Sequence, residues 1–110
     1  MPYDRGAMER VGQVLSASTG GVVGRPMMGA YCFMVDGRMC CGVTGDALML
    51  RLGPEGALAA LKEPHVRPFE IGGGRQPEAY VQVDPPGYAT DAALRAWLGR
   101  SLEFLRLMGD

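Results

Sequence analysis

The sequence predicts one α+β domain, a two-layer sandwich in which helices pack on one face of a mostly antiparallel sheet. Its length of 110 residues leaves room for one hydrophobic core and not for a second domain. Apolar residues recur at helical spacing near both ends of the chain and alternate with other residues between them. The inner segments are joined by short connections, which favour antiparallel pairing. The expected order is a helix, three or four strands, a helix, two strands and a helix.

The first helix is expected from Arg5 to about Ala17. Asp4 can cap its first turn, and an apolar stripe follows at helical spacing. The stripe consists of Met8, Val11 and Leu15. Gly20-Gly21 ends this helix, and a first strand is expected over Val22–Met28.

Asp36-Gly37 lies between two apolar runs and predicts a two-residue hairpin turn. Strict alternation from that turn pairs Cys32 with Cys41 and places Cys40 on the opposite face. We therefore expect the thiols of Cys32 and Cys41 to be close neighbours that can form a cross-strand disulfide under oxidation. The same register gives one apolar face with Cys32, Met34, Met39, Cys41 and Val43, and another with Tyr31, Phe33, Val35 and Cys40.

The second half of the chain predicts the remaining elements. A strand over Leu48–Leu52 leads into Gly53-Pro54-Glu55, which is a typical helix start, and that helix should end near Lys62 before Pro64. Two further strands are expected over Arg67–Ile71 and Ala79–Asp84, with Pro85-Pro86-Gly87 closing the sheet. The last helix should begin at Thr90 or Asp91 and end at Gly109. Its apolar stripe consists of Leu94, Trp97, Leu98, Leu102, Leu105 and Met108.

Composition and charge argue against several classes of protein. The net charge is −1 and the pI about 5.8, so direct binding to nucleic acid is disfavoured. The longest apolar stretch, Gly29 to Val35, is too short to span a membrane, and the N-terminus lacks the pattern of a secretion signal. Three cysteines, two of them adjacent, form no regular disulfide framework. A cytoplasmic, reducing location is therefore expected.

Candidate metal ligands and catalytic residues are few. Cys32, Cys40, Cys41 and His65 are the soft ligands besides the methionines, and no C-x-x-C pair occurs. No G-x-S-x-G motif is present, and the glycine run before Arg75 lacks the Lys-Ser/Thr of a phosphate-binding loop. We therefore expect no catalytic centre, no cofactor and no stoichiometric metal. A reactive thiol and a functional His65 remain as alternatives.

Arg25 and Arg51 are expected on or beside strands, where an arginine must reach solvent, pair with an acid or bind a ligand. Asp36, Asp46 and Glu70 are the expected ion-pair partners, because structural pairs are commoner than ligand clamps. The alternative is a small-ligand site that uses Arg25, Arg51, His65 or a thiol. That alternative requires these groups to meet in one pocket.

Five segments in the same order resemble the TfoX N-terminal domain family, and the likeness covers most of the chain. They are Arg25-Pro-Met-Met-Gly29, Phe33-Met-Val-Asp-Gly-Arg-Met-Cys-Cys-Gly42, Gly45-Asp-Ala-Leu-Met-Leu-Arg51, Pro64-His-Val-Arg-Pro68 and Tyr80-Val-Gln-Val-Asp84. The residues that carry the motif, and that we take as candidate interaction residues, are Arg25, Met27, Gly29, Phe33, Gly37, Met39, Cys41, Gly42, Asp46, Arg51 and His65.

This resemblance implies a two-layer α/β sandwich related to the fold of type III secretion chaperones. It also implies a role in regulation, because the founding members of the family regulate natural competence in transcription and carry a second, helical domain. The leading hypothesis is a non-enzymatic module that contacts another protein through its sheet or a sheet edge. A homodimer is the simplest assembly, because two copies of one apolar face can cover each other.

Overall fold

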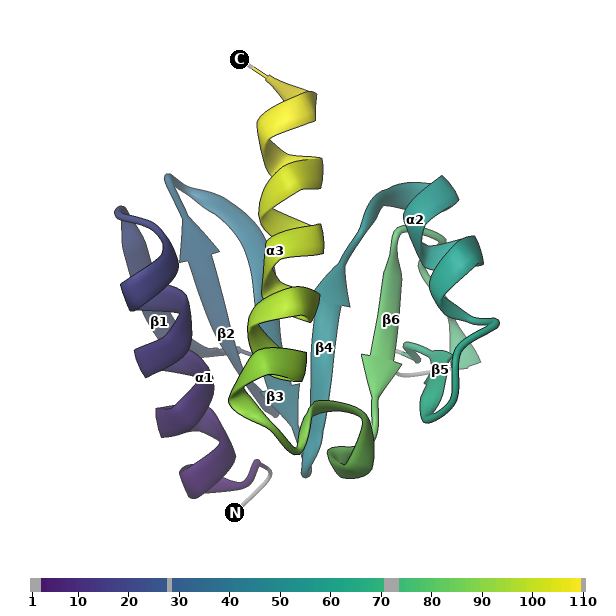
Figure 1. Ribbon diagram of the computed structural model, residues 1–110, viewed down its shortest axis with the longest axis horizontal. Coiled ribbons are helices and arrows are strands. Elements are labelled where there is room, and N and C mark those ends of the chain that lie inside the picture. The colour runs from purple at the N-terminus through teal and green to yellow at the C-terminus, as the bar shows by residue number, and fades with distance from the viewer. Residues whose placement is uncertain (1–2, 28, 71–73, 110) are drawn as a thin grey trace.

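A computed structural model describes residues 3–27, 29–70 and 74–109 of the chain. Figure 1 shows three helices lying on one face of a curved sheet, which confirms the predicted α+β sandwich. The helices are α1 (Arg5–Ser18), α2 (Gly53–Ala60) and α3 (Asp91–Met108), and a 3-10 turn, η2 (Pro85–Tyr88), precedes α3. The strands are β1 (Val22–Met27), β2 (Ala30–Val35), β3 (Arg38–Thr44), β4 (Ala47–Arg51), β5 (Val66–Pro68) and β6 (Tyr80–Val83).

The sheet is antiparallel and has the order β1-β2-β3-β4-β6-β5. The first four strands form a meander joined by short turns. β6 then inserts between β4 and β5, so β5 becomes an edge strand although it precedes β6 in the chain. β1 forms the other edge. Residues on β1 and on β5 are therefore separated by the full width of the sheet (Figure 1).

The ends of the helices follow the predicted capping residues. The Asp4 carboxylate accepts a hydrogen bond from the Ala7 amide, and the Thr90 hydroxyl accepts one from the Ala93 amide, each at 3.0 Å. Gly109 ends α3 with a left-handed φ of 68°, which glycine adopts without a Cβ clash. α2 ends at Ala60, close to the expected end near Lys62. The predicted bounds of β5, Arg67–Ile71, were wrong, because the strand covers Val66–Pro68; Ile71 and the glycines after it at 72–73 lie outside the described residues.

The core lies between the helices and the sheet. Val11 and Leu15 of α1 and Leu94, Leu98 and Leu105 of α3 supply its helical side. The sheet side comes from the alternate residues that face the helices, among them Val43, Leu48, Leu50, Val81 and Val83. These strand residues are fully buried, and each contributes about 2 kcal/mol by leaving water. α3 contacts β3 and β4 at the centre of the sheet and packs against α1 as well.

The predicted hairpin turn is confirmed, but the predicted register beyond it was wrong. Asp36 and Gly37 both have positive φ, 51° and 82°, as a two-residue turn of the primed type requires. Met34 pairs with Met39 as expected. The next pair, however, is Phe33 with Cys41, so Cys40 is an extra residue in a β-bulge. The bulge shifts every later residue of β3 by one position.

Candidate functional site

The face of the sheet that points away from the helices is here called the open face. Each methionine of a described strand lies on it, because these residues alternate with the core residues of the same strands. These methionines are Met27, Met34, Met39 and Met49. Ala30, Cys32 and Met49 form the buried centre of this face, and Met27, Met39, Phe69 and Tyr80 pack around it. The two faces of the sheet therefore differ in chemistry. Leucine and valine dominate the covered face, whereas the methionines of the described strands lie on the open one.

Gly42 makes the centre of the open face flat. It lies between Cys32 on β2 and Met49 on β4 in the strand register. A Cβ on Gly42 would lie 2.6 Å from the Tyr31 carbonyl oxygen and 3.1 Å from the methyl group of Met49. The absence of a side chain lets the Met49 thioether cover this position. Gly42 therefore has a defined packing role at the centre of the candidate surface.

Arg25 and Arg51 do not form the ion pairs expected for them. Among the described residues, neither is joined to a carboxylate by a salt bridge. Arg25 is exposed on β1 opposite Cys32, and it supplies a cation at the margin of the open face. Arg51 instead donates to the Met39 carbonyl at 3.4 Å, and its guanidinium carbon lies 5.8 Å from the centre of the Phe104 ring. Arg51 therefore has a structural role at the end of the sheet.

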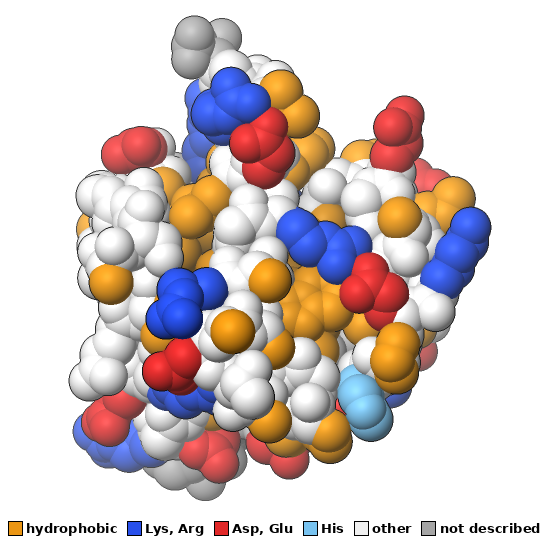
Figure 2. Space-filling view, viewed as in Figure 1, with side chains coloured by type: hydrophobic (Ala, Val, Ile, Leu, Met, Phe, Trp, Pro, Cys, Tyr) orange, Lys and Arg blue, Asp and Glu red, His pale blue; other side chains and the backbone are white. Residues whose placement is uncertain are grey.

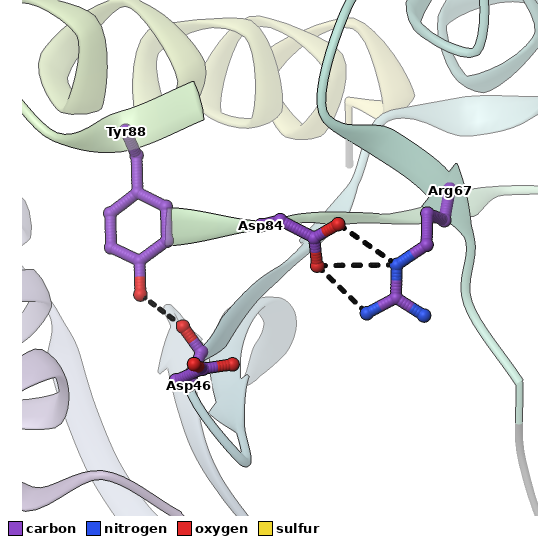
Figure 3. A network of polar contacts seen from close by, with 4 residues as sticks. All are labelled: Asp46, Arg67, Asp84 and Tyr88. Atoms are coloured by element: carbon purple, nitrogen blue, oxygen red, sulfur yellow. Dashed lines mark hydrogen bonds and ion pairs between the residues drawn. The ribbon is translucent and has the colours of Figure 1, made fainter. Parts of the chain in front are cut away.

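His65 and Asp46 lie at a different place from Arg25. His65 is exposed in the loop before β5, at the opposite edge of the sheet, with a positive φ of 68°. Asp46 contributes its backbone carbonyl, which accepts a hydrogen bond from the Tyr88 hydroxyl at 2.5 Å (Figure 3). This contact ties the β3–β4 turn to η2.

Figure 3 also shows the Arg67 guanidinium donating hydrogen bonds to the Asp84 carboxylate. Their closest contact is 2.8 Å, and it joins β5 to the residue that follows β6. The hydrogen bond from Arg67 lowers the pKa of Asp84. Both side chains remain partly exposed, 55% for Arg67 and 32% for Asp84, so the pair stabilises the edge of the sheet only weakly. The polar contacts of Figure 3 thus join neighbouring segments at the edge of the sheet.

The remaining motif residues shape the hairpins. Gly29 and Gly37 have positive φ in the two turns that flank β2. Phe33 faces the helices, with its ring centre 5.3 Å from that of Tyr31. Met27 and Met39 lie on the open face. Within the motif, Arg25, Met27, Met39 and Gly42 therefore converge on the open face, whereas Phe33, Cys41, Asp46, Arg51 and His65 do not.

The bulge changes the environment of the cysteines. Cys40 and Cys41 both pack in the core beneath α3, although alternation placed them on opposite faces. Cys32 lies on the open face. The predicted Cys32–Cys41 neighbourhood is therefore wrong, because the sheet separates the two thiols. His65 lies at the far edge of the sheet, so Cys32, Cys41 and His65 do not meet in one metal site. The described residues contain no group of three histidine, cysteine or acidic side chains that could hold a metal ion.

Ser101 on α3 supplies a hydrogen-bond partner for Cys40 at the bulge. Its hydroxyl donates to the Cys40 carbonyl at 2.9 Å and lies 3.3 Å from the Cys40 sulfur. A bulge interrupts the ladder of strand hydrogen bonds, and the serine gives the Cys40 carbonyl a partner. The hydrogen bond with Cys40, together with burial, raises the pKa of the Cys41 thiol, and burial raises that of Cys32 against the influence of Arg25. These two thiols are therefore protonated at neutral pH.

We expect the native protein to resist thiol modification. All three sulfhydryl groups are buried, so labelling should proceed at least about 100-fold more slowly in buffer than in guanidinium, where the same thiols are exposed. Labelling with a chromogenic disulfide, with and without denaturant, measures this ratio. Peptide mapping of the oxidised native protein should contain no link between Cys32 and Cys41. Such a link formed without denaturant would contradict the observed register.

Comparison with known families settles the membership of the chain. It matches the TfoX N-terminal domain over residues 14–105. The chain belongs to the TfoX N-terminal domain family. Membership in this family supports a role of the domain as a regulatory module, at the level of the family only. No curated protein and no solved structure matches, so the likeness to type III secretion chaperones stays an expectation.

Some features of this TfoX N-terminal domain were not singled out from the sequence. Met49 was missed, although the alternation Leu48-Met49-Leu50 already places it opposite the core leucines. Ser101 was missed because nothing local distinguishes it from other helical serines. The exposed Leu58 of α2 and Leu61, which follows that helix, were missed too. None of the described helices is both long and apolar enough to cross a membrane.

Proposed function

We propose that this domain is a non-enzymatic regulatory module that binds another protein through the open face of its sheet. The observation that carries the proposal is the gathering of the strand methionines on the one face that no helix covers. Thioether side chains are flexible and polarizable, so they adapt to the shape of a partner. Exposed Arg25 at the margin adds a cation that can fix the orientation of that partner.

The face supports this function better than either edge does. Pro26 on β1 has no amide hydrogen to donate to an added strand. The other edge, β5, has three residues and ends at Pro68. Both edges are thus poor templates for strand addition, which leaves the open face as the better candidate. A second copy of the chain is the simplest partner, because the same patch then meets itself around a two-fold axis.

The competing hypothesis is a small-ligand site or an enzyme that uses Arg25, Arg51, His65 or a thiol. It needs these groups in one pocket. Arg25 and His65 lie at opposite edges of the sheet, Arg51 is engaged by Met39 and Phe104, and the thiols are buried. The separation of these residues favours the interaction module.

Site-specific photo-crosslinking in cells tests the proposal. A benzophenone amino acid at Met34, on the open face, should give a discrete adduct. The same probe at Ala96, an exposed position of α3, should not. An adduct of twice the 11.7 kDa chain identifies a second copy as the partner, and any other mass identifies a different protein. Equal crosslinking from positions 34 and 96 would exclude the open face as the binding surface.

A further inference from the structure

A second apolar surface lies on the helix side of the molecule, around α2. Of the five exposed large hydrophobic side chains in the described chain, Leu58, Leu61, Leu107 and Met108 gather here, and only Val23 lies elsewhere. Figure 2 shows hydrophobic atoms at the surface over α2 and on the upper turns of α3. We call this surface the α2 patch. A contiguous apolar patch on a small domain usually marks a binding site.

The helix α2 is apolar on both sides, with the smaller residues turned inward. Ala57 and Ala60 pack into the core, whereas Leu58 and Leu61, which directly follows the helix, are 67% and 37% exposed. A helix that only had to cover the sheet would place its leucines inward and polar residues outward. The inverted arrangement lets α2 lie close to the sheet and leaves two large side chains for another contact.

Two hollows flank the first turn of α2. One has a volume of about 360 Å³ and includes Leu58, Leu61, Pro68 and Tyr80 in its wall. The other, of about 520 Å³, lies between α2 and the end of α3 and includes Phe104, Leu107 and Met108. Pro54 and Glu55 line both, so the two hollows adjoin at the first turn of α2.

The charges that line these hollows are negative. Glu55 lies between the two hollows, and Glu78 lines the first. Neither carboxylate forms an ion pair with another described residue. Lys62 follows Leu61 in the chain but lines neither hollow. An apolar groove with unpaired carboxylates is complementary to a segment that carries lysine or arginine beside apolar anchors.

We infer that the α2 patch binds a basic amphipathic helix of a partner protein, with its apolar side chains in the two hollows and its cations against Glu55 and Glu78. A second copy of this chain is a poorer occupant. At a two-fold interface the patch would meet itself and bring the same carboxylates together. The first hollow shares Tyr80 with the margin of the open face, but Leu58, Glu55 and Glu78 lie outside that face, so variants at these positions test the two proposals independently.

Fluorescence anisotropy with a labelled helical peptide of leucine and lysine tests the inference. The probe carries leucines at helical spacing, and its comparator has glutamate in place of each lysine. The intact chain should bind the lysine peptide at least about tenfold more tightly than the glutamate peptide. Raising the salt concentration should weaken that binding, because the attraction is partly electrostatic.

Matched variants locate the contact. Leu58→Gln and the double variant Glu55→Gln/Glu78→Gln should each weaken binding of the lysine peptide about fivefold or more. Val23→Gln removes a side chain of similar exposure, 60%, from the far edge of the sheet and should leave binding unchanged. Equal binding of the two peptides, or equal losses from L58Q and V23Q, would overturn the inference. So would sedimentation of the free chain as a dimer that L58Q converts to monomer, which would make a second copy the occupant.

Discussion

Replacing Gly42 by alanine is expected to destabilise the domain by about 3 kcal/mol, because the added methyl group has nowhere to go. Its Cβ would lie 2.6 Å from the Tyr31 carbonyl oxygen and 3.2 Å from Cys32 Cα, and both of these atoms belong to the backbone of β2. Gly42 has no left-handed φ, so the penalty arises from the contact and not from backbone conformation. Relief would require β2 and β3 to separate at the centre of the sheet.

Gly99→Ala is the matched control for this change. Gly99 lies on the exposed side of α3, and a Cβ there would meet no atom within 4 Å. Alanine should therefore stabilise the helix by about 1 kcal/mol through its higher helix propensity. Denaturant unfolding of both variants measures the two effects with opposite signs. A Gly42→Ala protein as stable as the parent would show that the strands are not packed as described.

Replacing Ser101 by alanine is expected to destabilise the domain by about 2 kcal/mol, since it leaves the buried Cys40 carbonyl without its hydrogen-bond partner. Ser101 is fully buried, and its hydroxyl lies 2.9 Å from that carbonyl. Water cannot replace the lost donor at a site enclosed between α3 and β3. The variant also removes the contact between the hydroxyl and the Cys40 sulfur.

Ser18→Ala removes an equivalent hydroxyl from the surface. The Ser18 hydroxyl donates to the Val14 carbonyl at 2.8 Å on the exposed part of α1. Water can take its place, so this variant should change the free energy of unfolding by less than about 0.5 kcal/mol. Thermal and denaturant unfolding compare the two variants directly. If Ser101→Ala proved no more destabilising than Ser18→Ala, the proposed role of Ser101 at the bulge would be wrong.

Local sequence signals predicted the elements but not the details set by distant residues. Asp36-Gly37 gave the hairpin turn, because the preference of these residues for positive φ is intrinsic. The bulge at Cys40 could not be predicted in this way. Its carbonyl is satisfied by Ser101, which lies 61 residues away in sequence. The order of β4, β6 and β5 likewise depends on packing between segments that are far apart in the chain.

The candidate site was predicted in part for the same reason. Alternation placed Cys32, Met34 and Met39 on one face, and that part of the prediction is confirmed. The bulge transferred Cys41 and Val43 to the covered face, which removed them from the proposed surface. The expected ion pairs of Arg25 and Arg51 depended on side-chain directions that composition and spacing do not determine.

The position of α3 after all six strands in the chain has a consequence for synthesis on the ribosome. An ion pair of 3.3 Å between Arg10 and Asp91 joins α1 to α3, and α3 covers the centre of the sheet. The hairpins of β1 to β4 involve neighbouring segments and can form early during translation. The part of their inner face that α3 covers nevertheless stays open until Leu94, Leu98 and Leu105 have emerged. The nascent chain therefore exposes part of its hydrophobic strands from the time β4 is made until α3 has emerged, and protection by a chaperone is most useful in that interval.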